Sequence, residues 1–233
     1  MYLRSVVLIL FILAACTGKE RKSADDPVRT DPSENITTAC SYENPVSELG
    51  QGLVIGGLRF SVYRDAALAE LMFNVDLSSG KTPAGFCPKF LKSDYGIAHL
   101  ICLEASQHHY KVLVDSSRMA YLPKVAGNFV TWEEYIVGSM GIRRKDNDTQ
   151  QLKVAPDDGA ANREVPAGHE LFCAMEMKDD WVRVTYDCHY NLEENPYEGM
   201  PCHEYIDKCT DPLTGWLRWK EGSKVRVDVF LFP

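Results

Sequence analysis

The chain has 233 residues, of which 45% are hydrophobic and 25% are charged, enough apolar material for one or two folded domains. Its formal net charge is −8 at pH 7, and no cluster of basic residues interrupts this acidic balance. Both features argue against nucleic-acid binding, which requires a positively charged surface.

The first residues have the pattern of a secretory signal peptide. Arg4 precedes an apolar run at 6–13, and the small residues Ala14 and Ala15 follow that run. The run is well short of the ~20 apolar residues that span a bilayer, so we expect residues 1–15 to be removed rather than to act as an anchor. Removal takes away Arg4 and no acid, which moves the net charge from −8 to −9.

The residues Leu13-Ala14-Ala15-Cys16 resemble the lipobox of bacterial lipoproteins. The resemblance implies that the thiol of Cys16 carries lipid, that the mature chain begins there, and that a membrane holds the protein outside the cytoplasm. Thr17 rather than an aspartate follows Cys16, which favours the outer membrane over the inner membrane. The alternative is an ordinary secreted protein with a chance cysteine at this position.

Residues 16–40 contain this cysteine and a polar, charged segment with Pro27 and Pro32. Such a segment cannot bury enough apolar surface to offset the entropy that it loses on ordering. We therefore expect a flexible tether between the lipid and the folded body.

From residue 41 onward the sequence predicts an all-β fold. Short runs rich in β-branched and aromatic residues are separated by clusters of glycine and proline. A helix is compatible only with residues 66–73 and with a turn near residues 132–135. The predicted strands lie at 58–62, 99–105, 110–115, 171–177, 181–186 and 225–232.

The strands repeat within the chain. Residues 120–122 match 215–217 at an offset of 95, residues 109–112 match 181–184 at an offset of 72, and residues 58–62 match 152–156 at an offset of 94. The changes of offset locate one insertion between Val62 and His109 and another at 185–214. Self-similarity on this scale indicates two copies of one small all-β unit.

The unit resembles the bacterial SH3-like domains, whose core is an aromatic-x-basic-Val strand followed by Gly-aromatic-hydrophobic. That core is Trp181-Val182-Arg183-Val184 with Gly215-Trp216-Leu217 in the second copy, and it is weaker in the first copy, where His109 and Ala120 depart from it. The resemblance implies two tandem SH3-like small β-barrels, at 41–140 and 141–233. Alternation places Val182 and Val184 on the face opposite to Trp181 and Arg183, one face being the core.

Without Cys16, seven cysteines remain, so at least one is unpaired or pairs between chains. Outside the cytoplasm disulfides are the default, and Cys188 with Cys209 would close the base of the second insertion. Pairing of Cys202 with either of these residues stays open, and Cys40 with Cys87 is a second candidate pair. We expect Cys102 and Cys173, which lie at nearly equivalent places in two apolar strands, to be buried small apolar residues.

We expect no catalysis, no metal and no cofactor. The chain has no third segment large enough for a Cys-His hydrolase domain. Cys188, His189, Cys202 and His203 lack the ligand spacing of the common zinc motifs. A small envelope enzyme or a metal-binding protein that uses these four residues remains the alternative.

The sequence instead favours a membrane-anchored binding module of the cell envelope that contacts peptidoglycan or an envelope protein. Aromatic grooves suit extended ligands, although core packing is the competing interpretation of the same residues. A further alternative is an inhibitor or a structural tandem. The candidate groove residues are Trp181, Tyr186, Trp216 and Trp219 in the second copy and Tyr110 and Tyr121 in the first.

Overall fold

The computed structural model describes residues 40–231. The expected signal peptide at 1–15, the expected lipidation site Cys16 and the expected tether up to residue 39 lie outside the described residues. In the part of the chain that the structure describes, no helix is both long and apolar enough to cross a membrane.

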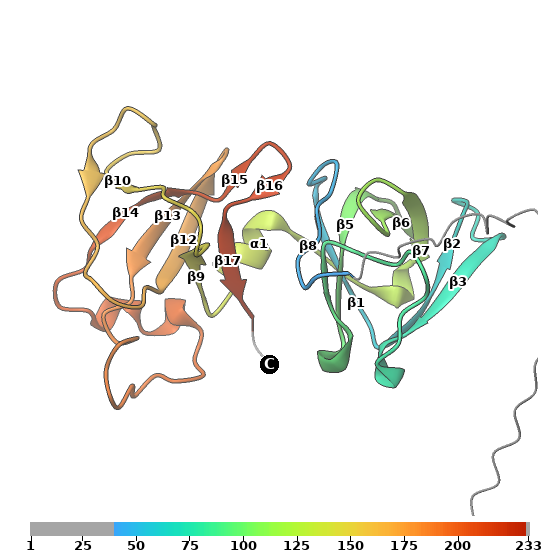
Figure 1. The fold of residues 1–233 in the computed structure, drawn as a ribbon, viewed down its shortest axis with the longest axis horizontal. Coiled ribbons are helices and arrows are strands. Elements are labelled where there is room, and N and C mark those ends of the chain that lie inside the picture. Colours follow the sequence, from blue (N-terminus) through green and yellow to red (C-terminus); the bar gives the residue numbers. More distant parts are fainter. Residues whose placement is uncertain (1–39, 232–233) are drawn as a thin grey trace, which may run out of the picture. The chain divides into compact units, whose positions relative to one another are not determined.

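Two antiparallel sheets make up the folded body (Figure 1). The first contains β1 (Gly52–Gly56), β2 (Arg59–Tyr63), β3 (Leu71–Asp76), β4 (Phe90–Lys92), β5 (Ile97–Ala105), β6 (His109–Leu113), β7 (Met119–Pro123) and β8 (Gly127–Thr131). The second contains β9 (Gly141–Arg144), β10 (Leu152–Lys153), β11 (Asn162–Arg163), β12 (Phe172–Lys178), β13 (Trp181–Tyr186), β14 (Thr214–Arg218) and β17 (Val227–Phe230).

A short hairpin and six helical segments complete the body. The hairpin consists of β15 (Lys220–Glu221) and β16 (Lys224–Val225). The only α-helix among the described residues is α1 (Trp132–Val137). The 3-10 turns are η1 (Leu77–Ser79), η2 (Ser93–Tyr95), η3 (Lys124–Ala126), η4 (Cys202–Glu204) and η5 (Ile206–Lys208).

The two sheets have the same strand order. The first runs β3-β2-β7-β6-β5-β1-β8, with β4 paired to β5 outside this path, and the second runs β11-β10-β14-β13-β12-β9-β17. Strand registers agree as well, because Val112 lies opposite Ala120 in the first sheet and Val184 lies opposite Gly215 in the second. Both sheets also carry a β-bulge one strand further on, between Cys102 and Glu104 and between Ala174 and Glu176. The structure thus contains two copies of one β unit at the predicted offsets of 72 and 95.

The predicted match at the opening strand is displaced by four residues. Tyr63 of β2 lies opposite Tyr121, and Lys153 of β10 lies opposite Trp216, so Tyr63 rather than Arg59 corresponds to Lys153. A shift of four keeps every side chain on its original face, since side chains alternate with a period of two. Alternation alone therefore could not detect this error.

The expectation of two closed barrels needs correction. Among the described residues, the end strands β3 and β8 of the first sheet do not pair with each other, nor do β11 and β17 of the second. In the first sheet the β2–β3 hairpin occupies the free edge of β7, and in the second sheet β10 with β11 occupies the edge of β14. Because β2 with β3 and β10 with β11 continue the sheets at these edges, each unit remains an open antiparallel sheet.

The side chains of β13 divide as alternation requires. Val182 and Val184 are fully buried, whereas Arg183 is partly exposed and pairs with Glu176. The valines therefore face the core, which the sequence had left open. Position 215 packs closely against this core and requires glycine, because a Cβ there would be only 2.5 Å from Cγ of Leu152.

One of the two helical segments compatible with the sequence is present. At Thr131 the side chain accepts a hydrogen bond from the N–H of Glu134, and the Glu134 carboxylate accepts one from the N–H of Thr131, a capping box that starts α1. The expectation that residues 66–73 could form a helix is wrong. There the carboxylate of Asp65 accepts bonds from the N–H groups of Ala69 and Glu70, which gives the backbone an alternative to helical bonding.

The two sheets share a hydrophobic core. One cluster lies within the first sheet and includes Val54 and Leu100. A second cluster joins Leu53 and Ile101, on the opposite face of the same strands, to α1 and to the second sheet. Both faces of β1 and β5 are therefore covered, which explains why these strands read as continuous apolar runs.

Candidate functional site

The insertion at residues 187–213 distinguishes the second copy from the first. Thr185 at the end of β13 lies directly opposite Thr214 at the start of β14, so the chain leaves the hairpin and returns to it at one place. In the first copy, Leu113 and Met119 occupy the corresponding places, and only a tight turn joins them. The insertion is thus an addition to a hairpin that closes without it.

Two disulfides fix the insertion. Cys188 and Cys209 close its base with their Cα atoms 6.0 Å apart, as the sequence favoured. Cys173 of β12 binds Cys202 with a Cα separation of 5.5 Å, which ties the middle of the insertion to the sheet. Each bridge restricts the unfolded chain and so stabilises the folded insertion.

Cys173 is buried, as expected, but it is bonded to Cys202 rather than being a free small apolar residue. Cys102 lies opposite Val112, and its counterpart opposite Val184 is Ala174 rather than Cys173. A displacement of one residue puts a side chain on the other face of the sheet. Cys173 therefore lies on the other face, where it is buried beneath the insertion, whereas Cys102 is buried in the core of the first sheet.

The remaining cysteines agree with two expectations, namely the candidate pair Cys40 with Cys87 and one unpaired cysteine among seven. Cys40 binds Cys87 with their Cα atoms 5.4 Å apart, and Cys102 is the free cysteine among the described residues. Burial raises the pKa of the Cys102 thiol to about 11, which keeps it protonated and unreactive. Three disulfides in one chain are typical of a protein that folds outside the cytoplasm.

A small buried cluster supports the insertion from inside. The rings of Tyr197 and Tyr205 stack with their centroids 4.7 Å apart. The hydroxyl of Tyr205 donates a 2.7 Å hydrogen bond to the carboxylate of Asp187, which is fully buried and also accepts from the N–H of His189 at 2.9 Å. Burial and this carboxylate raise the pKa of Tyr205 well above its ordinary value, so the hydroxyl remains a donor.

The outer surface of the insertion is acidic and partly apolar. Lys208 is the one lysine or arginine within residues 187–213. Large apolar side chains of the same segment are exposed too, with Tyr190 40% exposed, Leu192 50% exposed and Met200 37% exposed. We call this surface the acidic face; its exposed acids are Glu193, Glu194, Glu198, Glu204, Asp207 and Asp211.

The six aromatic residues expected to line a groove do not form one surface, although Trp181 and Trp216 share the outer face of β13 and β14. Trp219 and Tyr110 are buried in two different core clusters. The guanidinium of Arg218 covers the buried ring of Trp181, with 4.6 Å to its centroid. The others are only partly exposed: Tyr186 packs edge-on against Phe172, Tyr121 packs edge-on against His109, and Trp216 lies on the outer face of β14 opposite Arg183.

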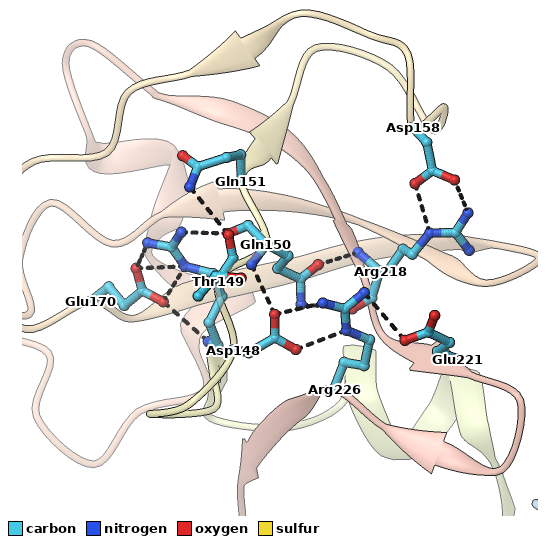
Figure 2. Close-up of polar contacts among 10 residues, drawn as sticks. Asp148, Thr149, Gln150, Gln151, Asp158, Glu170, Arg218, Glu221 and Arg226 are labelled. Carbon is cyan, nitrogen blue, oxygen red and sulfur yellow. Dashed lines mark hydrogen bonds and ion pairs between the residues drawn. The ribbon is translucent and has the colours of Figure 1, made fainter.

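A network of ion pairs lies on another side of the second sheet, and Figure 2 shows its central residues. Asp148 accepts hydrogen bonds from Nε and Nη2 of Arg226 at 2.8 and 2.7 Å, and Gln150 joins the backbone of Arg218 through its side-chain amide. Burial opposes ionisation of Asp148, but the guanidinium of Arg226 holds its pKa below its ordinary value.

This network neutralises its own charges. Arg144 pairs with Glu170, and Arg218 pairs with Asp158. The neighbouring cavity, of about 300 Å³, is lined by the paired residues Arg143, Arg144, Lys145 and Glu170. Because each of these cations already has a carboxylate, the network joins β9, the segment at 148–150, β14 and β17 rather than presenting charge to an anionic ligand.

A larger cavity, of about 610 Å³, lies along β17. β17 pairs only with β9, so its second edge is unpaired among the described strands. The aromatic residues that line this cavity come from three separate segments, which is why the sequence did not associate them. They are Tyr42, Phe90, Tyr95 and Phe230.

The cysteines and histidines of the insertion do not form the four-residue set considered from the sequence. Ligand atoms of Cys188, His189 and Cys209 lie within 4.8 Å of one another. Cys202 is instead bound to Cys173, and His203 is exposed.

Comparison with protein families, with curated proteins and with solved structures gives no match to this chain.

Proposed function

We propose that this protein is a lipid-anchored, non-catalytic component of a bacterial cell envelope, and that its insertion binds a partner protein. The observation that carries the proposal is the acidic face, where six exposed acids and the exposed Tyr190, Leu192 and Met200 occur on one segment held by two disulfides. Exposed apolar side chains within a polar rim are typical of protein–protein contacts.

The charge of this face selects the kind of partner. Six exposed acids with a single lysine favour a partner segment that carries lysine or arginine around an apolar side chain. The disulfides hold the face in one conformation, so little conformational entropy is lost on binding. Peptidoglycan is the less favoured ligand, because the carboxylates of its stem peptides would be repelled by the acidic face.

We also propose that the two β units are divergent SH3-like domains. Support comes from the shared strand order and from the pairing of the Trp181-Val182-Arg183-Val184 strand with the Gly215-Trp216-Leu217 strand. In this interpretation the units are a scaffold, and the insertion supplies the binding surface, in agreement with the general rule that function lies in sites carried by a fold.

The anchor makes its own prediction. In a bacterial host, wild-type protein is expected in the membrane fraction and labelled by a clickable fatty acid. The substitution Cys16→Ala is expected to abolish the label and to move the protein to the soluble fraction, because no acyl chain remains to insert into the bilayer. The matched control Cys40→Ala should keep the label. Equal labelling of the Cys16→Ala and wild-type proteins would refute lipidation at Cys16.

Charge reversal tests the binding surface. We expect the triple variant Glu193→Lys, Glu194→Lys, Glu198→Lys to capture at least ten-fold less of its crosslinked envelope partner than wild-type protein does. Reversal replaces attraction by repulsion at the face, and the wild-type capture should fall as salt is raised. Capture is measured by mass spectrometry after crosslinking in intact cells, with the wild-type and variant proteins at matched abundance.

The control reverses three exposed carboxylates outside the insertion, Glu48→Lys, Asp94→Lys and Glu164→Lys. This variant has the same net charge as the first and should retain wild-type capture. Equal losses in both variants would show that overall charge rather than the acidic face matters. If the wild-type protein and the first variant are retained equally on purified peptidoglycan sacculi, the ligand is peptidoglycan rather than a protein.

A further inference from the structure

Three potential metal ligands meet at the base of the insertion, apart from the acidic face. They are Cys188, His189 and Cys209, and their ligand atoms all lie within 4.8 Å of one another. Cys188 is exposed and Cys209 is buried, so a solvent-borne reagent reaches the bond between them from the Cys188 side. The other two disulfides belong to no such cluster among the described residues.

His189 is held beside this disulfide with an unsatisfied nitrogen. Its Nε2 is buried and has no hydrogen-bond partner among the described residues. The ring packs against Tyr197, with 4.8 Å between centroids, and the backbone N–H donates to Asp187, which fixes the residue in place. A buried nitrogen without a partner is rare in folded proteins, and this one is free to bind an ion once the neighbouring sulfurs become thiolates.

We infer that reduction of the Cys188–Cys209 disulfide opens a zinc site made of these two thiolates and the imidazole of His189. A dithiol protein or reagent supplies the two electrons and becomes a disulfide itself. The S–S bond of the insertion breaks, both sulfurs bind Zn²⁺ as thiolates, and the two protons of the dithiol are released. Two thiolates and one imidazole form a favourable set for zinc and leave a fourth position for water.

The same three residues therefore have two states. In the oxidised state the base of the insertion is closed by a covalent bond, and in the reduced state zinc closes it. Since Zn²⁺ has no redox chemistry of its own, it protects the thiolates without competing for their electrons. The insertion would then keep its conformation where a dithiol reductant is present, and this holds whether or not the acidic face binds a protein.

The test uses the full-length chain, with zinc alone as the probe. Protein reduced with a phosphine under anaerobic conditions is incubated with Zn²⁺, freed of excess metal by gel filtration and analysed by elemental mass spectrometry. We expect one zinc per reduced chain, none per oxidised chain, and at least a ten-fold loss of affinity in His189→Ala. Co²⁺ in place of Zn²⁺ should give thiolate-to-metal charge-transfer absorption that Cys209→Ser removes.

His203→Ala is the matched control, because His203 follows Cys202 as His189 follows Cys188, yet it lies outside the cluster. It should bind zinc like the wild-type protein. The inference fails if the reduced protein binds no zinc, if His189→Ala binds it equally well, or if His203→Ala abolishes binding. It fails too if reduction abolishes the near-ultraviolet circular dichroism and zinc does not restore it. Partner capture by the oxidised protein is measured separately, so the two proposals can fail independently.

Discussion

Replacing Trp132 with alanine is expected to lower the free energy of unfolding by about 3–5 kcal/mol. The ring is only 6% exposed, and its centroid lies 5.2 Å from that of Trp219, which directly follows β14 of the second sheet. Its Nε1 donates a 2.8 Å hydrogen bond to the carbonyl of Leu49, close to the start of the first sheet. The substitution therefore removes apolar contacts and leaves a buried carbonyl without its donor.

Chemical denaturation followed by circular dichroism measures this loss. Trp216→Ala is the matched control, because Trp216 has the same size but is partly exposed on the outer face of β14, and it should cost less than half as much. The wild-type protein should unfold in one transition, since both sheets contribute to one hydrophobic cluster. Two separate wild-type transitions, with Trp132→Ala shifting only one of them, would contradict a shared core.

Acid is expected to destabilise the protein through His99. This side chain is 5% exposed, its Nδ1 lies 3.1 Å from the hydroxyl of Tyr135, and burial lowers its pKa from 6.5 to about 4. As pH falls, the unfolded chain binds the proton before the folded chain does. The stability is therefore complete above about pH 6.5 and falls by about 3 kcal/mol between pH 6.5 and 4.

His99→Gln keeps an amide that can bond to Tyr135 but does not titrate in this range. Denaturation curves between pH 7 and 4 should show that this variant loses about 3 kcal/mol less than the wild-type protein. His108→Gln is the control, because His108 is exposed on the β5–β6 turn, and its pH dependence should match the wild type. Equal slopes for wild type and His99→Gln would mean that His99 is protonated as readily in the fold as in the unfolded chain.

Strands and their repeat could be predicted because they depend on local alternation. Trp181-Val182-Arg183-Val184 shows its two faces in the sequence, and the registers of β13 with β14 and of β6 with β7 agree with the predicted offsets. Closure of the sheets could not be predicted in the same way. Whether β7 meets the end of its own sheet or an extra hairpin depends on contacts between residues far apart in the chain.

The cysteines show how finely such predictions depend on register. Cys188 with Cys209 follows from chain geometry, because both lie near the point where the insertion leaves the hairpin. Cys173 with Cys202 depends on whether Cys173 or Ala174 lies opposite Val184, a difference of one residue that the apolar sequence of β12 does not reveal. The bulge after Ala174 makes simple counting along the strand less reliable still.

The candidate site was only partly accessible from the sequence. The insertion and its acids are visible as a segment, and so is the excess of acids over Lys208. Their exposure is not, since it depends on Asp187, Tyr197 and Tyr205 turning inward and leaving the acids outside. The tryptophans suggested a groove that the structure does not form. Large aromatic residues occur in cores as readily as in grooves, and Trp219 belongs to the core.

The Cys40–Cys87 bridge has a mechanical consequence for a body attached at its N-terminal end. A pull on the chain at Cys40 reaches Cys87 directly through covalent bonds. The residues between them, which include β1, β2 and β3, form a covalently closed loop and cannot be stripped from the body one after another. In a chain anchored at Cys16 as proposed, tension would therefore bypass β1, β2 and β3 and act on the sheet at Cys87, just before β4.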